Sequence, residues 1–333
     1  MSPSSTAVIS PEVLRIDASA ECLRIETWIR ECISHRLRRR GAVLGLSGGI
    51  DSSVVAALCA RALGAERVLG IFMPELDSSD ESLKYGELLA RFLGVPTVFE
   101  DIGPILEACG CYRRRDEAIR TVVAEYRSDW KCKLVLSDVA GGAQYAVSSL
   151  VVRSPEGIEK KVRLTAQAYS QIVAASNFKQ RTRKMLEYYH ADRLQYAVAG
   201  TPNRLEYDQG FFVKNGDGAA DFKPIAHLYK TQVYQLASYL NIPEEIQQRP
   251  STTDTFSLPQ SQEEFYFSVP LQSMDLCLFG KNHGISASDV AKAAGIDPQQ
   301  VERVYASIDA KRRATAYLQM APLLAEEIPQ VGH

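Results

Sequence analysis

The chain has few of the residues that build metal centres and disulfide frameworks. Its 333 residues include five histidines and seven cysteines, and the cysteines form neither a CxxC pair nor a regular disulfide spacing. Cys109, Cys111 and Cys132 could hold zinc only with a fourth ligand, and no histidine lies near them in the sequence. We therefore expect buried or free thiols, as in a cytoplasmic protein.

Long apolar runs and a strong net charge are also missing. No apolar stretch reaches the roughly 18–20 residues that cross a bilayer, and the first ten residues lack the charged and apolar regions of a signal peptide. The 38 Lys and Arg residues nearly balance the 40 Asp and Glu residues, so the net charge is -2. This balance gives no electrostatic reason to expect a nucleic acid or a membrane as partner.

Short apolar runs alternate with amphipathic stretches along much of the chain. Apolar runs of this length are typical of buried parallel strands, and the intervening stretches have helical character. This βαβαβ order predicts an α/β fold with a doubly wound, Rossmann-like parallel sheet and right-handed crossovers. The expected strands cover residues 42–46, 67–73, 95–99 and 195–199, and the expected helices cover residues 53–63, 81–93 and 165–189.

Other segments depart from this alternation. Residues 11–40 predict one long amphipathic helix that ends in a basic cluster, which suits a solvated helix C-terminus. Residues 112–163 contain strand-like runs and a turn, which predicts a small β-rich insertion. Two further helices are expected in the tail, over residues 284–295 and 297–315. We expect residues 1–333 to form a single domain that carries this insertion.

The segment SGGIDSS at residues 47–53, called the phosphate loop below, joins the first strand to a helix. Its glycines let the backbone approach an anion, and the N–H groups at the helix N-terminus point toward phosphates. Ser47, Ser52 and Ser53 add hydroxyl donors. The carboxylate of Asp51 would be unfavourable in an anion cradle unless a cation such as Mg²⁺ bridges it to the phosphates. The loop is neither a Walker motif nor a GxGxxG fingerprint.

The phosphate loop resembles the signature of the N-type ATP pyrophosphatases, which split ATP into AMP and pyrophosphate while activating a carboxyl or carbonyl group. Residues 200–206 (GTPNRLE) and 210–221 (GFFVKNGDGAAD) resemble motifs of the NAD synthetase family within that group. The match continues without a gap through residues 224–233, and residues 176–183 are similar to an arginine-bearing helix of the family. The resemblance therefore implies an ammonia-dependent NAD synthetase or a divergent paralogue.

The resemblance also implies roles for single residues. Asp51 and Glu206 would ligate Mg²⁺, and Asp51 and Lys230 would be the catalytic pair. Lys230 has independent support, because a lysine in the first turns of a helix beside the loop suits a departing pyrophosphate. The residues implied to bind ATP are Gly45, Leu46, Ser47, Gly48, Gly49, Ile50, Asp51, Ser52, Ser53, Thr201, Lys230 and Thr252.

The second substrate implied by the resemblance is nicotinic acid adenine dinucleotide, or deamido-NAD. Arg183, Lys214, Asp221 and Lys311 fall where the family contacts it. Two of them have simpler interpretations, because Arg183 could be a surface helix charge and Asp221 a carboxylate that caps a turn.

The implied reaction has two steps. The nicotinate carboxylate attacks the α-phosphorus of ATP, and ammonia then displaces AMP from the acyl adenylate. Because a mixed anhydride hydrolyses readily, we expect a mobile lid, for which residues 249–269 are the candidate. No glutaminase domain is expected, so ammonia would be free or supplied by a separate glutaminase. Family members are usually homodimers, which implies a homodimer here.

Three departures from the family leave the activated carboxylate open. The insertion at 112–163 is extra, aromatic residues replace an acidic stretch at 263–267, and Ala310 replaces a histidine. A paralogous ligase that amidates another carboxylate is therefore the alternative. Residues 288–304 also resemble a helix-turn-helix, but that region has little excess positive charge, which disfavours DNA binding.

Overall fold

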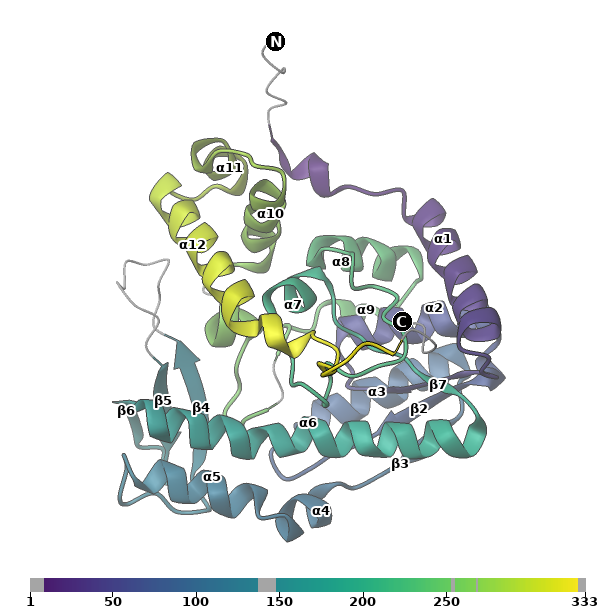
Figure 1. The fold of residues 1–333 in the computed structure, drawn as a ribbon. Coiled ribbons are helices and arrows are strands. Elements are labelled where there is room, and N and C mark those ends of the chain that lie inside the picture. The colour runs from purple at the N-terminus through teal and green to yellow at the C-terminus, as the bar shows by residue number, and fades with distance from the viewer. Residues whose placement is uncertain (1–8, 137–147, 253–254, 268, 329–333) are drawn as a thin grey trace.

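A four-stranded parallel sheet organises the larger part of the fold, with the small sheet and the C-terminal helices to one side of it (Figure 1). The structure is a computed structural model, and it describes residues 9–136, 148–252, 255–267 and 269–328. The strand order is β3-β2-β1-β7, so β7 joins β1 on the side opposite β2. The predicted parallel α/β sheet is confirmed. The strands are β1 (Ala42–Gly45), β2 (Val68–Phe72), β3 (Thr97–Phe99) and β7 (Ala197–Val198).

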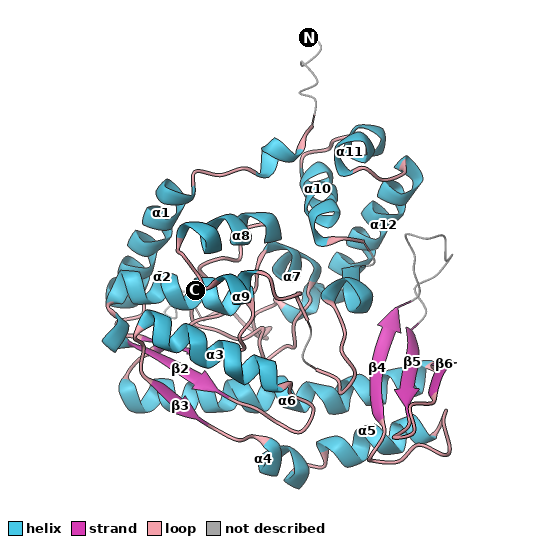
Figure 2. Cartoon of the chain, turned by 180° about the vertical axis from the view of Figure 1, so that it is seen from behind, coloured by secondary structure: helices cyan, strands magenta, loops and turns pink. Residues whose placement is uncertain are grey.

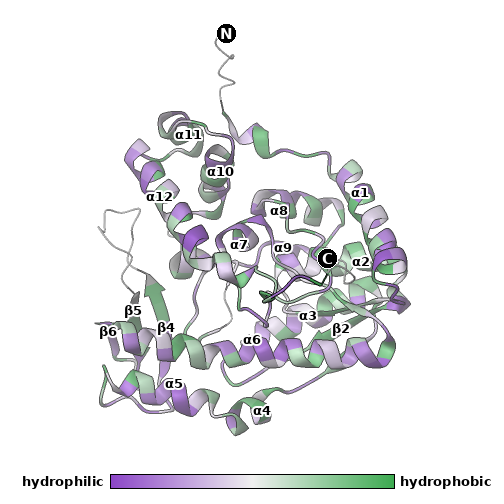
Figure 3. Ribbon diagram, in the orientation of Figure 1, coloured by the Kyte–Doolittle hydropathy of each residue, from purple (hydrophilic) through white to green (hydrophobic). Residues whose placement is uncertain are grey.

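Helices cover both faces of this sheet, because successive side chains of each strand point to opposite faces. Ala42 and Leu44 of β1 belong to a core shared with α1, α2, α3 and α8, whereas Val43 belongs to a core shared with α4, α5 and α6. Figure 3 shows hydrophobic residues along strand β2 and helix α2, which pack against each other. These helices are α1 (Ala18–Glu31), α2 (Ile50–Leu63), α3 (Asp80–Leu93), α4 (Gly103–Ala108), α5 (Cys111–Arg120), α6 (Ala166–Leu194) and α8 (Lys230–Tyr239).

The prediction of one helix over residues 11–40 is wrong. The segment is divided into η1 (Pro11–Leu14), α1 and η2 (Cys32–Arg36), with an extended residue after η1. The side chain of Gln235 binds this extended stretch, accepting from Ile16 N at 3.0 Å and donating to Leu14 O at 2.9 Å. This contact and the Asp17 cap, whose carboxylate accepts from Ala20 N, set the start of α1.

A second, antiparallel sheet confirms the small β-rich part of the fold. Its order is β4-β5-β6, with β4 (Lys131–Leu136), β5 (Ser148–Arg153) and β6 (Glu159–Arg163). The first of these strands begins only at Lys131, because α5 occupies the start of the predicted range and packs against α6. Residues 137–147 of the predicted insertion lie outside the described residues. One face of β4 and β5 packs on the first turns of α6, whereas the end of α6 packs on the parallel sheet, so the two sheets lie toward opposite ends of this helix (Figure 2).

The C-terminal helices form a separate core around α10. The predicted helix at 284–295 begins only at Ala287, where Ser286 caps it, and the next helix begins after the Asp297 cap. No helix in the described ranges is long and apolar enough to cross a membrane. The remaining elements are η3 (Ala65–Arg67), α7 (Arg204–Gln209), α9 (Glu244–Gln247), η4 (Glu263–Phe267), α10 (Leu271–Asn282), α11 (Ala287–Ala294), α12 (Pro298–Thr315) and η5 (Ala316–Leu318).

Candidate active site

A cavity of about 470 Å³ opens at the carboxyl ends of β1 and β2. The chain leaves β1 toward β2 on one side and returns to β7 on the other, so this is the point where the direction of strand order reverses. Open α/β sheets bind ligands at such points. The phosphate loop, α6, α7, the edge of β4 and segment 249–269 complete the wall.

The phosphate loop is held in shape by its own hydroxyl groups. Ser52 Oγ and Ser53 Oγ donate to Gly49 O at 3.0 and 2.8 Å, and Gly49 N donates to Ser47 Oγ at 3.3 Å. Ser53 is fully buried, so among the predicted ATP residues it supports the loop from behind. The residues of this region that line the cavity are Gly45, Leu46, Ser47, Gly49, Ile50, Asp51 and Ser52.

Gly48 gives the loop its turn, and an alanine there is expected to damage it. Gly48 has a φ of 68°, and a Cβ atom would lie 2.7 Å from Ser82 O and 2.8 Å from Tyr85 Cβ. Both the left-handed backbone and the contact with main chain disfavour any side chain. We expect Gly48→Ala to weaken ATP binding at least about tenfold, equivalent to about 1.4 kcal/mol.

Calorimetric titration with ATP would measure the loss. Gly94→Ala is the control, because Gly94 also has a positive φ of 66° but an added Cβ meets nothing within 4 Å. Equal ATP affinity in Gly48→Ala and the wild type would contradict this account of the loop.

Asp51 and Lys230 meet in the cavity although 179 residues separate them. The ammonium of Lys230 donates to Asp51 Oδ2, and the lysine side chain is 1% exposed. Burial opposes the charged amine, but the carboxylates of Asp51 and Glu206 outweigh it and raise the pKa of Lys230. Asp275 fixes the start of α8 by accepting from the backbone N–H groups of Lys230 and Thr231. The cavity therefore contains a fixed positive charge beside the phosphate loop.

Glu206 lies close to Asp51 through a shared neighbour, Asn203. Asn203 Nδ2 donates to Asp51 Oδ1 at 3.1 Å, and Asn203 N donates to Glu206 Oε2 at 3.1 Å. Burial and then the negative charge of Asp51 raise the pKa of Glu206 to about 8. Two partly buried carboxylates that repel each other fit a divalent cation, which would neutralise both.

The donor set around this pair suits Mg²⁺. No group of three or more His, Cys, Asp or Glu side chains able to hold a metal occurs in the part of the chain that the structure describes. Two carboxylates that leave most coordination positions to phosphate and water are the usual arrangement for Mg²⁺. Asp51 and Glu206 therefore fit the ion, with the substrate completing its coordination.

Arg249 is a cavity residue that the sequence reasoning missed. Its Nη1 donates to Ser47 O at 3.2 Å, and its Nη2 donates to Ser82 Oγ at 2.8 Å. The guanidinium lies 5.5 Å from the centre of the Tyr85 ring. Arg249 thus joins segment 249–269 to the phosphate loop, 202 residues away in sequence. No local motif marks it. Thr201 and Thr252, which were predicted, line the same cavity.

The four residues predicted to bind the second substrate are distributed unevenly. Arg183 lines the cavity and donates from Nε to Met73 O at 3.3 Å. Lys214 instead donates to Tyr317 O at 2.8 Å, and Asp221 accepts from Val198 N at 2.7 Å. Lys214 and Asp221 are thus outside the described cavity wall, and their substrate role stays a prediction.

Lys311 lies behind an aromatic wall of the cavity. Phe211 and Tyr266 line the cavity and stack with ring centres 4.5 Å apart. Lys311 Nζ lies 4.1 Å from the centre of the Tyr266 ring and donates to Tyr266 O at 2.6 Å. In this arrangement Lys311 supports Tyr266, and direct contact with a substrate stays a prediction.

Segment 249–269 forms one side of the cavity. It contributes polar side chains as well as the aromatic residues of η4, and Gln262 Nε2 donates to Glu206 Oε1 at 3.0 Å. Its position fits a lid, and its movement stays a prediction. The residues of the segment that line the cavity are Arg249, Pro250, Ser251, Thr252, Thr255, Phe256, Gln262, Phe265 and Tyr266.

The chain is similar to known proteins in sequence and in fold. The family model described as NAD synthase matches residues 21–132 and 145–314. A relative from Mesorhizobium japonicum named NH(3)-dependent NAD(+) synthetase is 61% identical over 95% of this chain and 99% of its own.

Two solved structures share the fold. The NMN synthetase from Francisella tularensis is 21% identical, with a TM-score of 0.64 over 94% of this chain and 100% of its own. The NH3-dependent NAD synthetase from Campylobacter jejuni is 24% identical, with a TM-score of 0.60 over 93% of this chain and 100% of its own. At these identities both show similarity of fold alone.

Proposed function

The chain belongs to the NAD synthase family, and we propose that its cavity adenylates the carboxylate of deamido-NAD with ATP and transfers the acyl group to ammonia. The enzyme is an ATP-dependent ligase of the ammonia-dependent NAD synthetase type, and its products are NAD, AMP and pyrophosphate. One observation carries the site assignment: a single cavity contains the phosphate loop, the Asp51–Lys230 pair and Arg183.

The first step joins the substrate carboxylate to the α-phosphorus and releases pyrophosphate. Ser47, Ser52 and the N-terminus of α2 bind the phosphates, and Lys230 stabilises the charge that develops on the departing pyrophosphate. In the second step the lone pair of ammonia attacks the acyl carbon, the bond to AMP breaks, and a proton is lost as the amide forms. Most of the acceleration comes from positioning and charge stabilisation, so no side-chain nucleophile is required.

Mg²⁺ accompanies ATP in this reaction and supplies positive charge at the phosphates. Asp51 and Glu206 are the proposed ligands. Because Asp51 also accepts a hydrogen bond from Asn203 Nδ2, its carboxylate is held in one orientation. Arg183 is the proposed contact to the second substrate, and Lys214, Asp221 and Lys311 are proposed to join it only in the substrate complex.

The alternative, amidation of another carboxylate, is disfavoured by the 61% identity to an ammonia-dependent NAD synthetase over nearly the whole chain. The Francisella tularensis structure named NMN synthetase has the same fold, so nicotinate mononucleotide is the appropriate competing substrate in the test. Three finer features belong to the proposal: a homodimer, a cytoplasmic location, and ammonia that is either free or supplied by a separate glutaminase.

Pyrophosphate release tests the proposed function. At saturating ATP, Mg²⁺ and ammonia, we expect release to depend on added deamido-NAD and to be at least about a hundredfold slower in Asp51→Ala, the loss typical of a removed charge-positioning group. Nicotinate mononucleotide should be the poorer substrate by kcat/KM. Release that is independent of deamido-NAD, or a preference for the mononucleotide, would contradict the assignment of the acceptor.

A further inference from the structure

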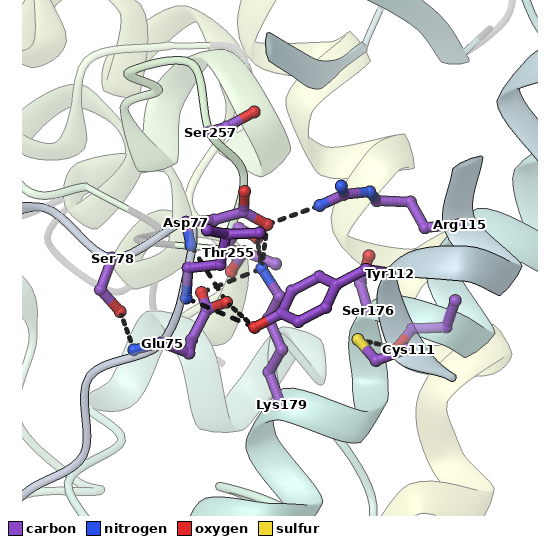
Figure 4. Close-up of polar contacts among 12 residues, drawn as sticks. Glu75, Asp77, Ser78, Cys111, Tyr112, Arg115, Ser176, Lys179, Thr255 and Ser257 are labelled. Atoms are coloured by element: carbon purple, nitrogen blue, oxygen red, sulfur yellow. Dashed lines mark hydrogen bonds and ion pairs between the residues drawn. The ribbon is translucent and has the colours of Figure 1, made fainter. Parts of the chain in front are cut away.

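A cluster of buried charges lies beside the cavity, where three segments of the chain meet (Figure 4). Lys179 comes from α6, Arg115 from α5, and Glu75 and Asp77 from the loop that follows β2. The side chains of these four residues are at most 5% exposed. Burying charges is unfavourable unless each is paired and hydrogen-bonded, so the contacts of every member matter.

The ammonium of Lys179 uses its three donors on two different walls of the cavity. It donates to Glu75 Oε1 at 3.0 Å and to Asp77 Oδ2 at 2.6 Å, both in the loop after β2. The third bond goes to the backbone oxygen of Thr255 at 2.7 Å, in segment 249–269. An ammonium has three N–H groups, so losing any of these bonds would leave a buried charge incompletely satisfied. Lys179 therefore joins the two walls.

Both walls line the cavity that also contains Arg183. Pro74 and Ser78 of the first wall and Thr255 of the second line the cavity. Arg183 donates to Met73 O, immediately before the same loop. A shift of either wall would therefore move the surroundings of Arg183, whereas the phosphate loop keeps its internal bonds and its contact with Arg249, which precedes Thr255 in the segment.

The free edge of β4 holds the next residues of the same segment. Cys132 N donates to Ser257 Oγ at 2.9 Å, and Leu258 N donates to Cys132 O at 3.1 Å. Gln260 Nε2 donates to Leu134 O. The small sheet thus provides the edge on which the segment lies, and Lys179 fixes the segment immediately before that edge.

We propose that Lys179 is a positioning residue for the acceptor half of the reaction, which rests on the function proposed above. It holds the Thr255 carbonyl against the loop after β2 and so keeps the two walls beside Arg183 at a fixed separation. The edge of β4 continues the same support from Ser257 to Gln260. Displacements near 1 Å in such supporting structure can lower turnover by about a hundredfold.

Two double variants separate positioning from general stability. Lys179→Met/Glu75→Gln removes one cation and one carboxylate and loses the bond to Thr255. Arg115→Met/Asp116→Asn removes one cation and one carboxylate from the same region. It loses the bonds from Arg115 to Asp116 Oδ1 at 3.0 Å and to Asp77 Oδ2 at 2.5 Å, but it leaves the Lys179–Thr255 contact in place. The five side chains concerned are those of Glu75, Asp77, Arg115, Asp116 and Lys179. Each variant retains one cation and two carboxylates among them, so the two variants are matched in charge.

Steady-state kinetics and hydrogen exchange give the readouts. In Lys179→Met/Glu75→Gln we expect kcat/KM for deamido-NAD to fall about ten- to a hundredfold while the KM for ATP changes less than about threefold. Backbone amides in peptides covering residues 255–262 should exchange at least about tenfold faster, equivalent to about 1.4 kcal/mol of local opening. Arg115→Met/Asp116→Asn should keep the wild-type values for both readouts.

Equal changes in the two variants would overturn the proposal, because the cluster would then act only on stability. Unchanged kinetics and exchange in Lys179→Met/Glu75→Gln would overturn it as well. If that variant does not fold, Lys179→Gln/Glu75→Gln, which keeps an amide donor at position 179, provides the same comparison. Pyrophosphate release by the wild type that does not depend on deamido-NAD would refute the proposed function. Hydrogen exchange in residues 255–262 of the two variants would still decide whether Lys179 holds segment 249–269 in place.

Discussion

Replacing Lys230 with methionine is expected to lower kcat/KM for NAD formation about a thousandfold, the upper range for loss of one preorganised charge in an active site. The buried ammonium lies beside the phosphate loop and is paired with Asp51. Without it, the developing negative charge on pyrophosphate has one fewer partner, and the repulsion between Asp51 and Glu206 is no longer offset.

The measurement is pyrophosphate release at saturating ATP and Mg²⁺ with varied deamido-NAD. Lys281→Met is the matched control, because Lys281 also pairs with an aspartate, Asp309, at 2.6 Å but lies among the C-terminal helices. The control should keep kcat/KM within about twofold of the wild type, the range expected of a distant surface substitution. A folded Lys230→Met enzyme with wild-type kcat/KM would remove Lys230 from the mechanism.

The second large effect concerns stability against pH at Lys311. Burial lowers the pKa of this amine to about 7 in the folded chain, despite its contacts with Tyr266. In the unfolded chain a lysine stays protonated to about pH 10. Between these values the unfolded state binds more protons, so the contribution of Lys311 to the free energy of unfolding increases as pH rises from about 7 to 10.

Chemical denaturation between pH 6 and 10 would measure the free energy of unfolding of the wild type and of Lys311→Met, and the effect would show as a difference between the two that depends on pH. We expect the difference in free energy of unfolding to grow in favour of the wild type by on the order of 1 kcal/mol per pH unit above pH 7, and to be flat below it. The control is Lys292→Met, on the exposed side of α11. Its free energy of unfolding should depend on pH in the same way as that of the wild type. A difference that does not vary with pH would mean that Lys311 keeps its charge in the folded protein.

Some predictions could be made from sequence because the structure concerned is local. The phosphate loop lies between an apolar strand and a helix, and its glycines and hydroxyls act within seven residues. The alternation of strands and helices similarly identified the parallel sheet, because burial on both faces makes each strand continuously apolar. The start of α1 was missed because it depends on Gln235, more than 200 residues away.

The residues of the cavity also divide into those that a local motif identifies and those that only distant contacts place. Asp51, Glu206 and Lys230 carry motif signals, whereas Arg249 and Lys179 act through contacts with segments distant in sequence. Lys311 was matched to a family position, but its place behind Tyr266 depends on the packing of α12 against η4. A motif gives the type of residue at a position, and it cannot give the direction in which the folded chain points that residue.

The sequence by itself determined the sheet, the phosphate loop and the adenylating chemistry, since each depends on residues that are neighbours along the chain or on a long match to one family. Only the tertiary structure decided that the small sheet holds residues 257–260 along the edge of β4 and that Lys179 joins two walls of the cavity. Those contacts connect segments about 75 to 125 residues apart, and their formation depends on how the helices pack.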